Sequence, residues 1–125
     1  MTDLVAIVNA FYDASAVGDF DAAEAMMTDD FQITEADNLP FGGVYKGKSA
    51  LRDLFAKVMA MMSVAELKHS HMMVGENSVC CVVDMIMADG GEPIQLLEMF
   101  VFRGDKVCEI RPFYFNADAV AAKCA

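Results

Sequence analysis

The chain has 125 residues, of which 56% are hydrophobic, and nineteen acidic against nine basic residues give it a net charge of −10. This length fits one domain, residues 1–125, and the negative charge disfavours nucleic acid as a partner, because phosphates would be repelled. No apolar stretch approaches the ~20 residues of a membrane-spanning helix and the N-terminus lacks the basic start of a signal peptide, so we expect a cytoplasmic protein without a membrane partner.

The N-terminal part of the chain has the apolar spacing of helices. The first predicted helix carries apolar residues at helical spacing from Leu4 onwards and ends at Gly18. Asp19 can cap a second, short helix, whose apolar stripe includes Met27. The acidic pair at 29–30 is expected to close this helix.

A short strand at 31–35, a loop at 38–43 and a third helix at 51–62 are predicted next. From about residue 63 to residue 115 the pattern changes to four β-rich runs. Turn segments rich in Gly, Asn and Asp separate these runs, at 75–77, 89–91 and 103–105. Helices followed by an antiparallel meander predict an α+β fold, with the helices on one face of the sheet.

Both alternating sets of side chains are largely apolar in the runs at 79–87 and 96–102. An antiparallel sheet with one solvated face alternates apolar and polar residues instead. Because the helices can cover only one face, we expect a homodimer formed through the convex face of the sheet. The residues assigned to that face are Val79, Cys81, Val83, Met85, Met99 and Val101.

Three short motifs occur in a particular order along the chain. They are Gly18-Asp19-Phe20-Asp21, Asp29-Asp30-Phe31 and, in the last strand, Arg111-Pro112-Phe113-Tyr114-Phe115. Their order and spacing resemble the nuclear-transport-factor-two-like superfamily over nearly the whole chain, and within it the SnoaL-like proteins and ketosteroid isomerases. The resemblance implies a cone-shaped α+β barrel, with three N-terminal helices on the concave face of a strongly curved, mainly antiparallel sheet. It does not select one activity, since the superfamily includes isomerases, cyclases, hydrolases, dehydratases and non-catalytic binders.

The resemblance to the isomerases also implies roles for individual residues. Glu35, a few residues beyond the acidic pair, matches their catalytic base. Glu98, two residues before Phe100, matches the second acid, which stays protonated and donates a hydrogen bond. The tyrosine of the first isomerase helix is replaced by Phe11, and the adjacent Tyr12 is expected to point about 100° away around the helix.

The alternation of strand residues extends this candidate pocket. If Glu98 points inward, a matching register turns Asp84 inward on the preceding strand, and His69 and His71 share a face of the strand before it. The expected pocket is largely apolar and opens near the 38–43 loop. Its substrate-binding residues are predicted to be Phe11, Tyr45, Phe55, His69, His71, Phe100 and Tyr114.

Each acid also has a structural interpretation. Glu35 can end a strand at the surface, Glu98 can pair with Arg111 or Arg52, and Asp84 can lie on the opposite face at a dimer interface. Carboxyls that do converge in an apolar cavity cannot all ionise, so at least one should have a raised pKa. One can then act as base while another donates a hydrogen bond, as in the known ketosteroid isomerase example.

Two functions follow from this site. Glu35, Glu98 and Asp84 would serve a cofactor-independent isomerase, cyclase or dehydratase acting on a small hydrophobic or carbonyl-containing ligand. Alternatively, the chain is a non-catalytic ligand-binding or dimeric scaffold module. A third hypothesis, in which His69 and His71 hold a metal with Asp84 or Glu98, is weaker because one H-x-H pair is a common accident, and we predict no metal or cofactor.

Overall fold

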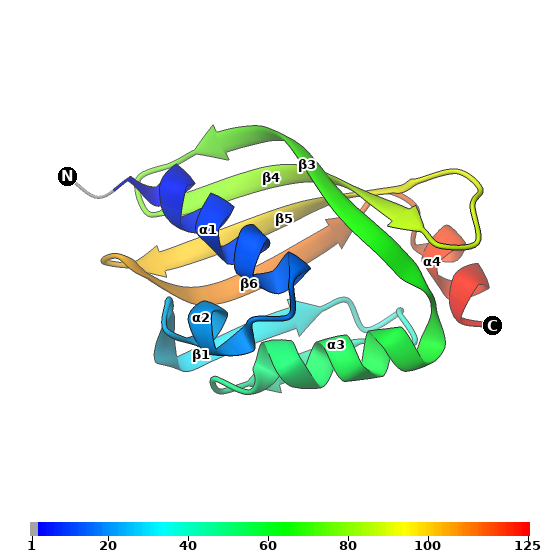
Figure 1. Cartoon of the computed structure of the whole chain (residues 1–125), viewed down its shortest axis with the longest axis horizontal. Helices are drawn as coiled ribbons and strands as arrows, with labels where there is room; N and C mark the ends of the chain where they lie inside the picture. The colour runs from blue at the N-terminus through cyan, green and yellow to red at the C-terminus, as the bar shows by residue number, and fades with distance from the viewer. Residues whose placement is uncertain (1–2) are drawn as a thin grey trace.

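The computed structural model describes residues 3–125, which form four helices and one six-stranded sheet. The elements are α1 (Leu4–Ala16), α2 (Phe20–Glu24), β1 (Met27–Glu35), β2 (Gly43–Lys46), α3 (Ala50–Met61), β3 (Val64–Val74), β4 (Ser78–Met87), β5 (Ile94–Arg103), β6 (Lys106–Tyr114) and α4 (Ala117–Cys124). Helices α1, α2 and α3 lie on one side of the curved sheet, as predicted, and α4 lies at its far end (Figure 1). No helix among residues 3–125 is long and apolar enough to cross a membrane.

Helix α1 is fixed by its ends and by one apolar face. The Asp3 carboxylate accepts a hydrogen bond from the Ala6 amide at 3.1 Å and so caps the first turn. Gly18 ends the helical segment with a φ of +71°, a conformation that strongly favours glycine. Val8, Phe11 and Tyr12 are buried against the sheet, so α1 presents its aromatic residues to the sheet's inner face.

The boundary between α2 and β1 differs from the prediction. Helix α2 ends at Glu24, and Met27 belongs to β1, where it pairs with Val107 of β6. The acidic pair at 29–30 therefore lies within the strand and is exposed. Pairing with β6 outweighs the weak local preference of this segment for helix. The strand β2 and the helix α4 were not predicted from the sequence.

The strands lie in the order β2-β1-β6-β5-β4-β3. The four runs after residue 63 form the predicted meander, β3 to β6, in which consecutive strands pair antiparallel. Strand β6 then pairs with β1 in parallel, so the last strand lies between β1 and β5. This arrangement brings β1 and β5 within two strand spacings of each other.

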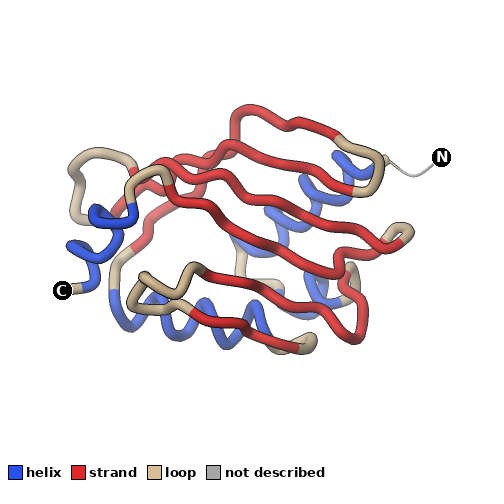
Figure 2. The backbone as a smooth tube through the Cα atoms, turned by 180° about the vertical axis from the view of Figure 1, so that it is seen from behind, coloured by secondary structure: helices blue, strands red, loops and turns tan. Residues whose placement is uncertain are grey.

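In β4 the residues that point toward the helices are those that were predicted to point away from them. Register pairs Cys81 with Glu98 and Val83 with Leu96, so these residues share the inner face with the helices. The buried residues of β4 are Val79, Cys81, Val83, Met85 and Met87. Four residues assigned to a dimer interface are thus in the core, and the outer face, turned toward the viewer in Figure 2, carries the alternate set. Because side chains alternate with period two, the predicted register between β4 and β5, which was wrong by one residue, assigned every side chain of β4 to the wrong face.

A β-bulge changes the face of residues in β3. Leu67 pairs with Met85 and His69 with Val83, which places both on the inner side. The register then shifts, and His71 pairs with Val82 of the outer face. His69 and His71 therefore do not share a face, contrary to the prediction. An extra residue in one strand reverses the inside–outside pattern beyond it.

Candidate functional site

Two glutamates lie in one row across the inner face of the sheet. Glu98 of β5 is directly opposite Pro112 of β6 on one side and Cys81 of β4 on the other. Glu35 of β1 is two residues beyond Ile33, which pairs with Ile110, and Pro112 of β6 is two residues beyond Ile110, so the same parallel spacing sets Glu35 level with Pro112. With adjacent strands about 4.8 Å apart, the two acid-bearing backbones are separated by roughly 10 Å. Two carboxyls can thus approach one ligand from neighbouring positions.

The Tyr12 hydroxyl donates a hydrogen bond to Glu98 Oε1 at 2.5 Å. The expectation that Tyr12 points away from the pocket is therefore wrong. Helix α1 buries a face wide enough for both Phe11 and Tyr12, and both rings contact Phe100 edge-on, at 5.6 and 5.5 Å between centroids. Val8, Phe11, Tyr12 and Ser15 follow the i, i+3, i+4, i+7 spacing, which was the signal for this wider stripe.

Glu35 is a buried acid without a cation. Only 4% of the residue is exposed, and its Oε1 atom is buried with no hydrogen-bond partner. Burial, and secondly repulsion from Glu98, raise the pKa of Glu35 to about 8. An unpartnered carboxyl oxygen in this position is destabilising. A ligand that donates a hydrogen bond to Glu35 Oε1 would supply the missing partner.

The surroundings of Glu98 favour protonated forms. Burial raises the pKa of the Glu98 carboxyl, and the hydrogen bond from Tyr12 opposes this shift only in part. Burial, and then the charge of Glu98, raise the pKa of Tyr12 far above its usual value. Burial likewise raises the pKa of the adjacent Cys81 thiol to about 11. Burial therefore disfavours the charged forms of all three groups in this corner of the site.

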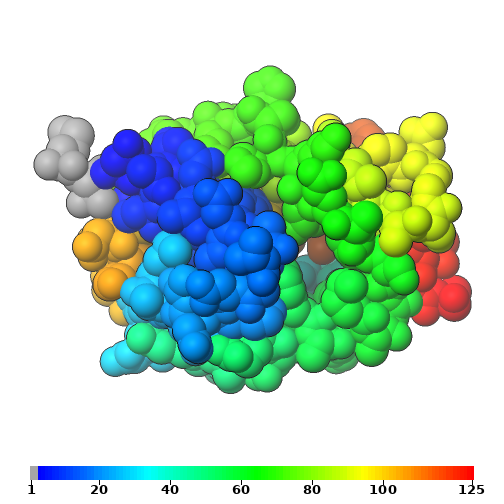
Figure 3. All heavy atoms as spheres, in the orientation of Figure 1, coloured from blue at the N-terminus to red at the C-terminus, as the bar shows by residue number. Residues whose placement is uncertain are grey.

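The acid pair lies on the face of the sheet that the helices cover. Leu96 and Phe100 are buried, whereas Glu98, between them on the same strand face, retains partial exposure. Figure 3 shows a hollow between the atoms of α3 and β3, with atoms in the colours of β6 at its floor. Two other hollows, of about 320 and 330 Å³, lie near α4 and share Phe113 and Tyr114 in their lining. Glu35 and Glu98 line neither hollow, although Pro112, the partner of Glu98 in the sheet, lines the hollow that reaches Asn38 and Leu39.

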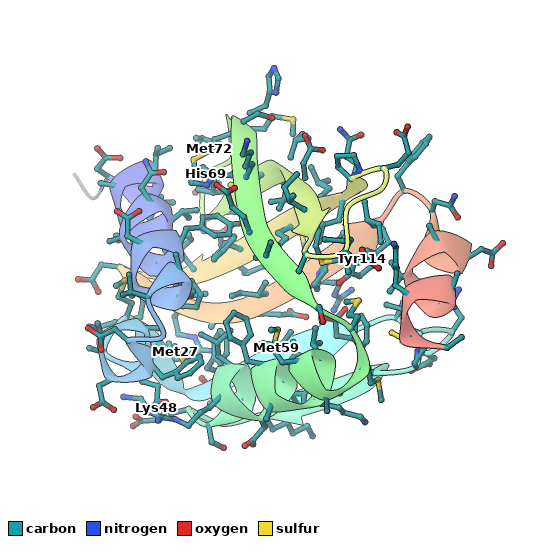
Figure 4. All side chains as sticks on the ribbon, turned by 45° about the vertical axis from the view of Figure 1, so that its right-hand side comes forward. Met27, Lys48, Met59, His69, Met72 and Tyr114 are labelled. Atoms are coloured by element: carbon teal, nitrogen blue, oxygen red, sulfur yellow. The ribbon has the colours of Figure 1, made fainter. Side chains whose placement is uncertain are left out.

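Aromatic side chains accompany the acids on the inner side. Phe55 of α3 packs edge-on against Phe20 at 5.4 Å, and Tyr114 packs against Phe41 at 6.3 Å. Burial, and then the charges of Glu35 and Glu98, raise the pKa of Tyr114. In Figure 4, His69 and Met72 lie on β3, while Tyr114 lies toward α4. These phenylalanine and tyrosine rings belong to the hydrophobic core or pack against it.

Three predicted site residues lie away from the acid row. Asp84 is on the outer face, where the Gln95 amide donates a weak hydrogen bond to it at 3.4 Å. His71 is exposed on the outer side and contacts Ser70. Tyr45 donates its hydroxyl proton to the Phe41 carbonyl at 2.7 Å, which fixes a loop. With His69 and His71 on opposite sides of β3, the two-histidine metal hypothesis is contradicted, and residues 3–125 contain no cluster of three metal-ligating side chains.

Comparison with known proteins places this geometry in a family. Bal32a, from a soil-derived mobile gene cassette, is 15% identical, with a TM-score of 0.86, 98% of this chain covered and 96% of that one. TerC, crystallised with polyporic acid, is 12% identical, with a TM-score of 0.83 and 97% of each chain covered. A protein of Sinorhizobium meliloti, named as a proposed polyketide cyclase, is 20% identical, with a TM-score of 0.70 and coverage of 85% and 92%.

These three structures share the fold of this chain, and their low identities support the fold alone. Two Burkholderia proteins named as nuclear-transport-factor-two-like have the same fold, with TM-scores of 0.82 and 0.76 at 13% and 21% identity; for the first, 100% of this chain and 99% of that one are covered, and for the second, 98% and 95%. No curated protein matches the sequence. The model of the SnoaL-like domain matches residues 8–110, which include most of α1, both acids and most of the sheet. The chain therefore belongs to the SnoaL-like family.

Proposed function

We propose that this protein is a cofactor-independent acid–base enzyme, an isomerase, cyclase or dehydratase acting on a small apolar carbonyl compound. The observation that carries the proposal is the pairing of two unlike carboxyls on one sheet face. Glu35 has an unpartnered, buried oxygen, whereas Glu98 accepts a short hydrogen bond from Tyr12. Pairs of acids whose environments differ in this way are typical of proton-transfer sites.

In this proposal Glu35 is the base and Glu98 the neutral donor. Tyr12 occupies one Glu98 oxygen, and the second carries the proton and donates it to a carbonyl oxygen of the substrate. Glu35 removes a proton from the carbon next to that carbonyl, and the developing negative charge on oxygen is stabilised by the Glu98 donor. Since Glu35 titrates near pH 8, kcat/KM should rise with pH and level off above that value.

The direct test is exchange of carbon-bound hydrogen. Small cyclic ketones and enones are incubated with the protein in D₂O, and loss of the proton next to the carbonyl is followed by ¹H NMR. The natural chain should accelerate exchange, and Glu35→Gln should reduce the rate roughly 100- to 10,000-fold, the usual contribution of a general base. The matched control is Glu109→Gln, because Glu109 lies on the outer face and is paired with Arg111.

The alternative is a module that binds the same ligand without reacting. A naphthol can accept hydrogen bonds from Glu98 through its oxygen and pack on the aromatic rings, so its binding can be measured by fluorescence. Binding of 2-naphthol without exchange of any ketone in the panel would favour the binding module. Full exchange activity in Glu35→Gln would contradict the assignment of the base.

We also propose that a second copy of this chain covers the outer face. Val82, Leu97 and Met99 are partly exposed there, and Phe113 and Phe115 beside them are 49% and 87% exposed. On this face the charges of Glu109 and Arg111 already pair within the chain, which favours contact between two identical apolar patches. Sedimentation should give a dimer at micromolar concentration, and Leu97→Lys a monomer. A monomeric natural chain at that concentration would contradict this proposal.

A further inference from the structure

We propose that His69, held by Asn9, is a positioning residue that keeps the Tyr12 hydroxyl on Glu98; this inference rests on the proposed function. The His69 ring stacks on the Tyr12 ring with centroids 4.7 Å apart and planes 12° from parallel. Its Nε2–H donates to the Asn9 side-chain oxygen at 3.1 Å. The imidazole thus joins two residues of α1 from the opposite strand.

The positions of Asn9, Tyr12 and His69 in the sequence bring them together on α1 and β3. Asn9 and Tyr12 are three positions apart on α1 and so lie on neighbouring positions of one helix face. His69 pairs with Val83 of the inner face, immediately before the bulge in β3. The bulge directs His71 to the outer side, so one histidine turns toward α1 and the other away from it. Bulges next to functional sites commonly redirect a side chain in this way.

The Tyr12 ring is confined on two sides. His69 covers one face, and Phe100 meets the ring edge-on at 5.5 Å and 68°. The hydroxyl can then lie 2.5 Å from Glu98 Oε1 without sampling other rotamers. His69 itself is exposed, so burial of its own ring adds little to the core. Since small displacements of a catalytic group reduce rates strongly, loss of the stack should lower catalysis more than stability.

The test compares three variants in the exchange assay. His69→Ala removes the stack and the Asn9 contact, His69→Phe keeps an aromatic ring there, and His71→Ala is the matched control on the outer side. We expect His69→Ala to lower kcat about tenfold with KM unchanged. His69→Phe should recover most of this loss, and His71→Ala should match the natural chain. Natural kcat in His69→Ala, or no recovery in His69→Phe, would overturn the proposal.

A second measurement does not depend on catalysis. The Tyr12 hydroxyl proton, in a short hydrogen bond to Glu98, should give a slowly exchanging downfield signal in the ¹H NMR spectrum. Its exchange with solvent should accelerate about tenfold in His69→Ala and stay near the natural rate in His69→Phe and His71→Ala. If no ketone is turned over but this pattern appears, the proposed function fails while the positioning role stands. Unchanged exchange in His69→Ala would contradict the positioning role whatever the activity.

Discussion

The two faces of the sheet treat carboxylates in opposite ways. On the outer face, Glu109 accepts hydrogen bonds from Arg111 at 2.9 and 3.1 Å and from Thr34 at 2.9 Å. Partial burial would raise the pKa of Glu109, but these hydrogen bonds lower it overall. On the inner face, Glu35 is one residue from Thr34 yet has no cation, and its pKa is raised to about 8.

This contrast arises from local alternation and not from distance along the chain. Thr34 and Glu35 are neighbours in β1, and their side chains point to opposite faces of the same strand. On the outer face Glu109 forms an ion pair with Arg111, and such exposed pairs contribute little to the free energy of unfolding. On the inner face Glu35 and Glu98 form no ion pair with a cation of the described residues, which reduces stability but leaves groups that can transfer protons. The predictions below test this difference.

The largest effect should be on how stability depends on pH. The folded state binds the Glu35 proton more tightly than the unfolded chain does, because the pKa rises from 4.5 to about 8. The stability it contributes is complete below pH 4.5 and is lost as pH rises through about 8, by up to about 5 kcal/mol. Glu35→Gln should therefore be more stable than the natural chain at pH 9 and should flatten this pH dependence, as measured by urea unfolding.

Glu109→Gln serves as the control on the other face. The lowered pKa of Glu109 contributes stability that is present above its unfolded pKa and lost as pH falls through the lowered value, so its sign is opposite. Its removal should change the unfolding free energy at pH 9 by less than about 1 kcal/mol. Equal pH profiles for the two variants would show that the faces do not differ.

Removal of the Tyr12 hydroxyl should have an intermediate effect. Tyr12→Phe leaves Glu98 Oε1 without its donor, which should reduce stability by about 1–3 kcal/mol in urea unfolding. Because the hydrogen bond lowers the pKa of Glu98, its loss should raise that pKa further, as followed by ¹³C NMR of the carboxyl carbon. Tyr45→Phe, which removes a hydroxyl bonded to a backbone carbonyl, should leave the Glu98 titration unchanged. A downward shift in Tyr12→Phe would contradict the arrangement.

The smallest effect is expected for the ion pair of the outer face. Arg111→Leu removes the partner of Glu109, and we expect a loss of about 0–1 kcal/mol because the pair is partly exposed. The pKa of Glu109 should move upward, while exchange activity at Glu35 stays unchanged. Loss of activity in Arg111→Leu, with the fold intact by circular dichroism, would connect the two faces.

The fold was predicted from the sequence more completely than the site. The turn residues at 75–77, 89–91 and 103–105 defined the hairpins, because glycine and asparagine have strong local preferences. The face assigned to Asp84 was wrong, since both faces of β4 are apolar and their pattern does not fix the register. The bulge between His69 and His71 has no simple local signal. Tyr12 could have been found by counting the full apolar stripe of α1 instead of the angle from Phe11 alone.

Glu35 and Glu98 came from the resemblance to known isomerases, and the structure places both on the inner face. Their different states could not be read from the sequence. The hydrogen bond at Glu98 comes from Tyr12 of α1, and Glu35 Oε1 is unpartnered because no neighbouring element within residues 3–125 supplies a donor. Such surroundings are tertiary, because they combine residues far apart in the chain.

The insertion of β6 between β1 and β5 has a consequence for how the protein acquires its site during folding. The row that contains both acids is complete only when Pro112 occupies the position between them. The β3–β5 meander can form from nearby residues, whereas the parallel β1–β6 pair joins residues as far apart in the sequence as Met27 and Val107. Such long-range pairing is intrinsically slow. A nascent chain that ends before residue 106 would hold both glutamates, but it would lack the strand that sets their spacing.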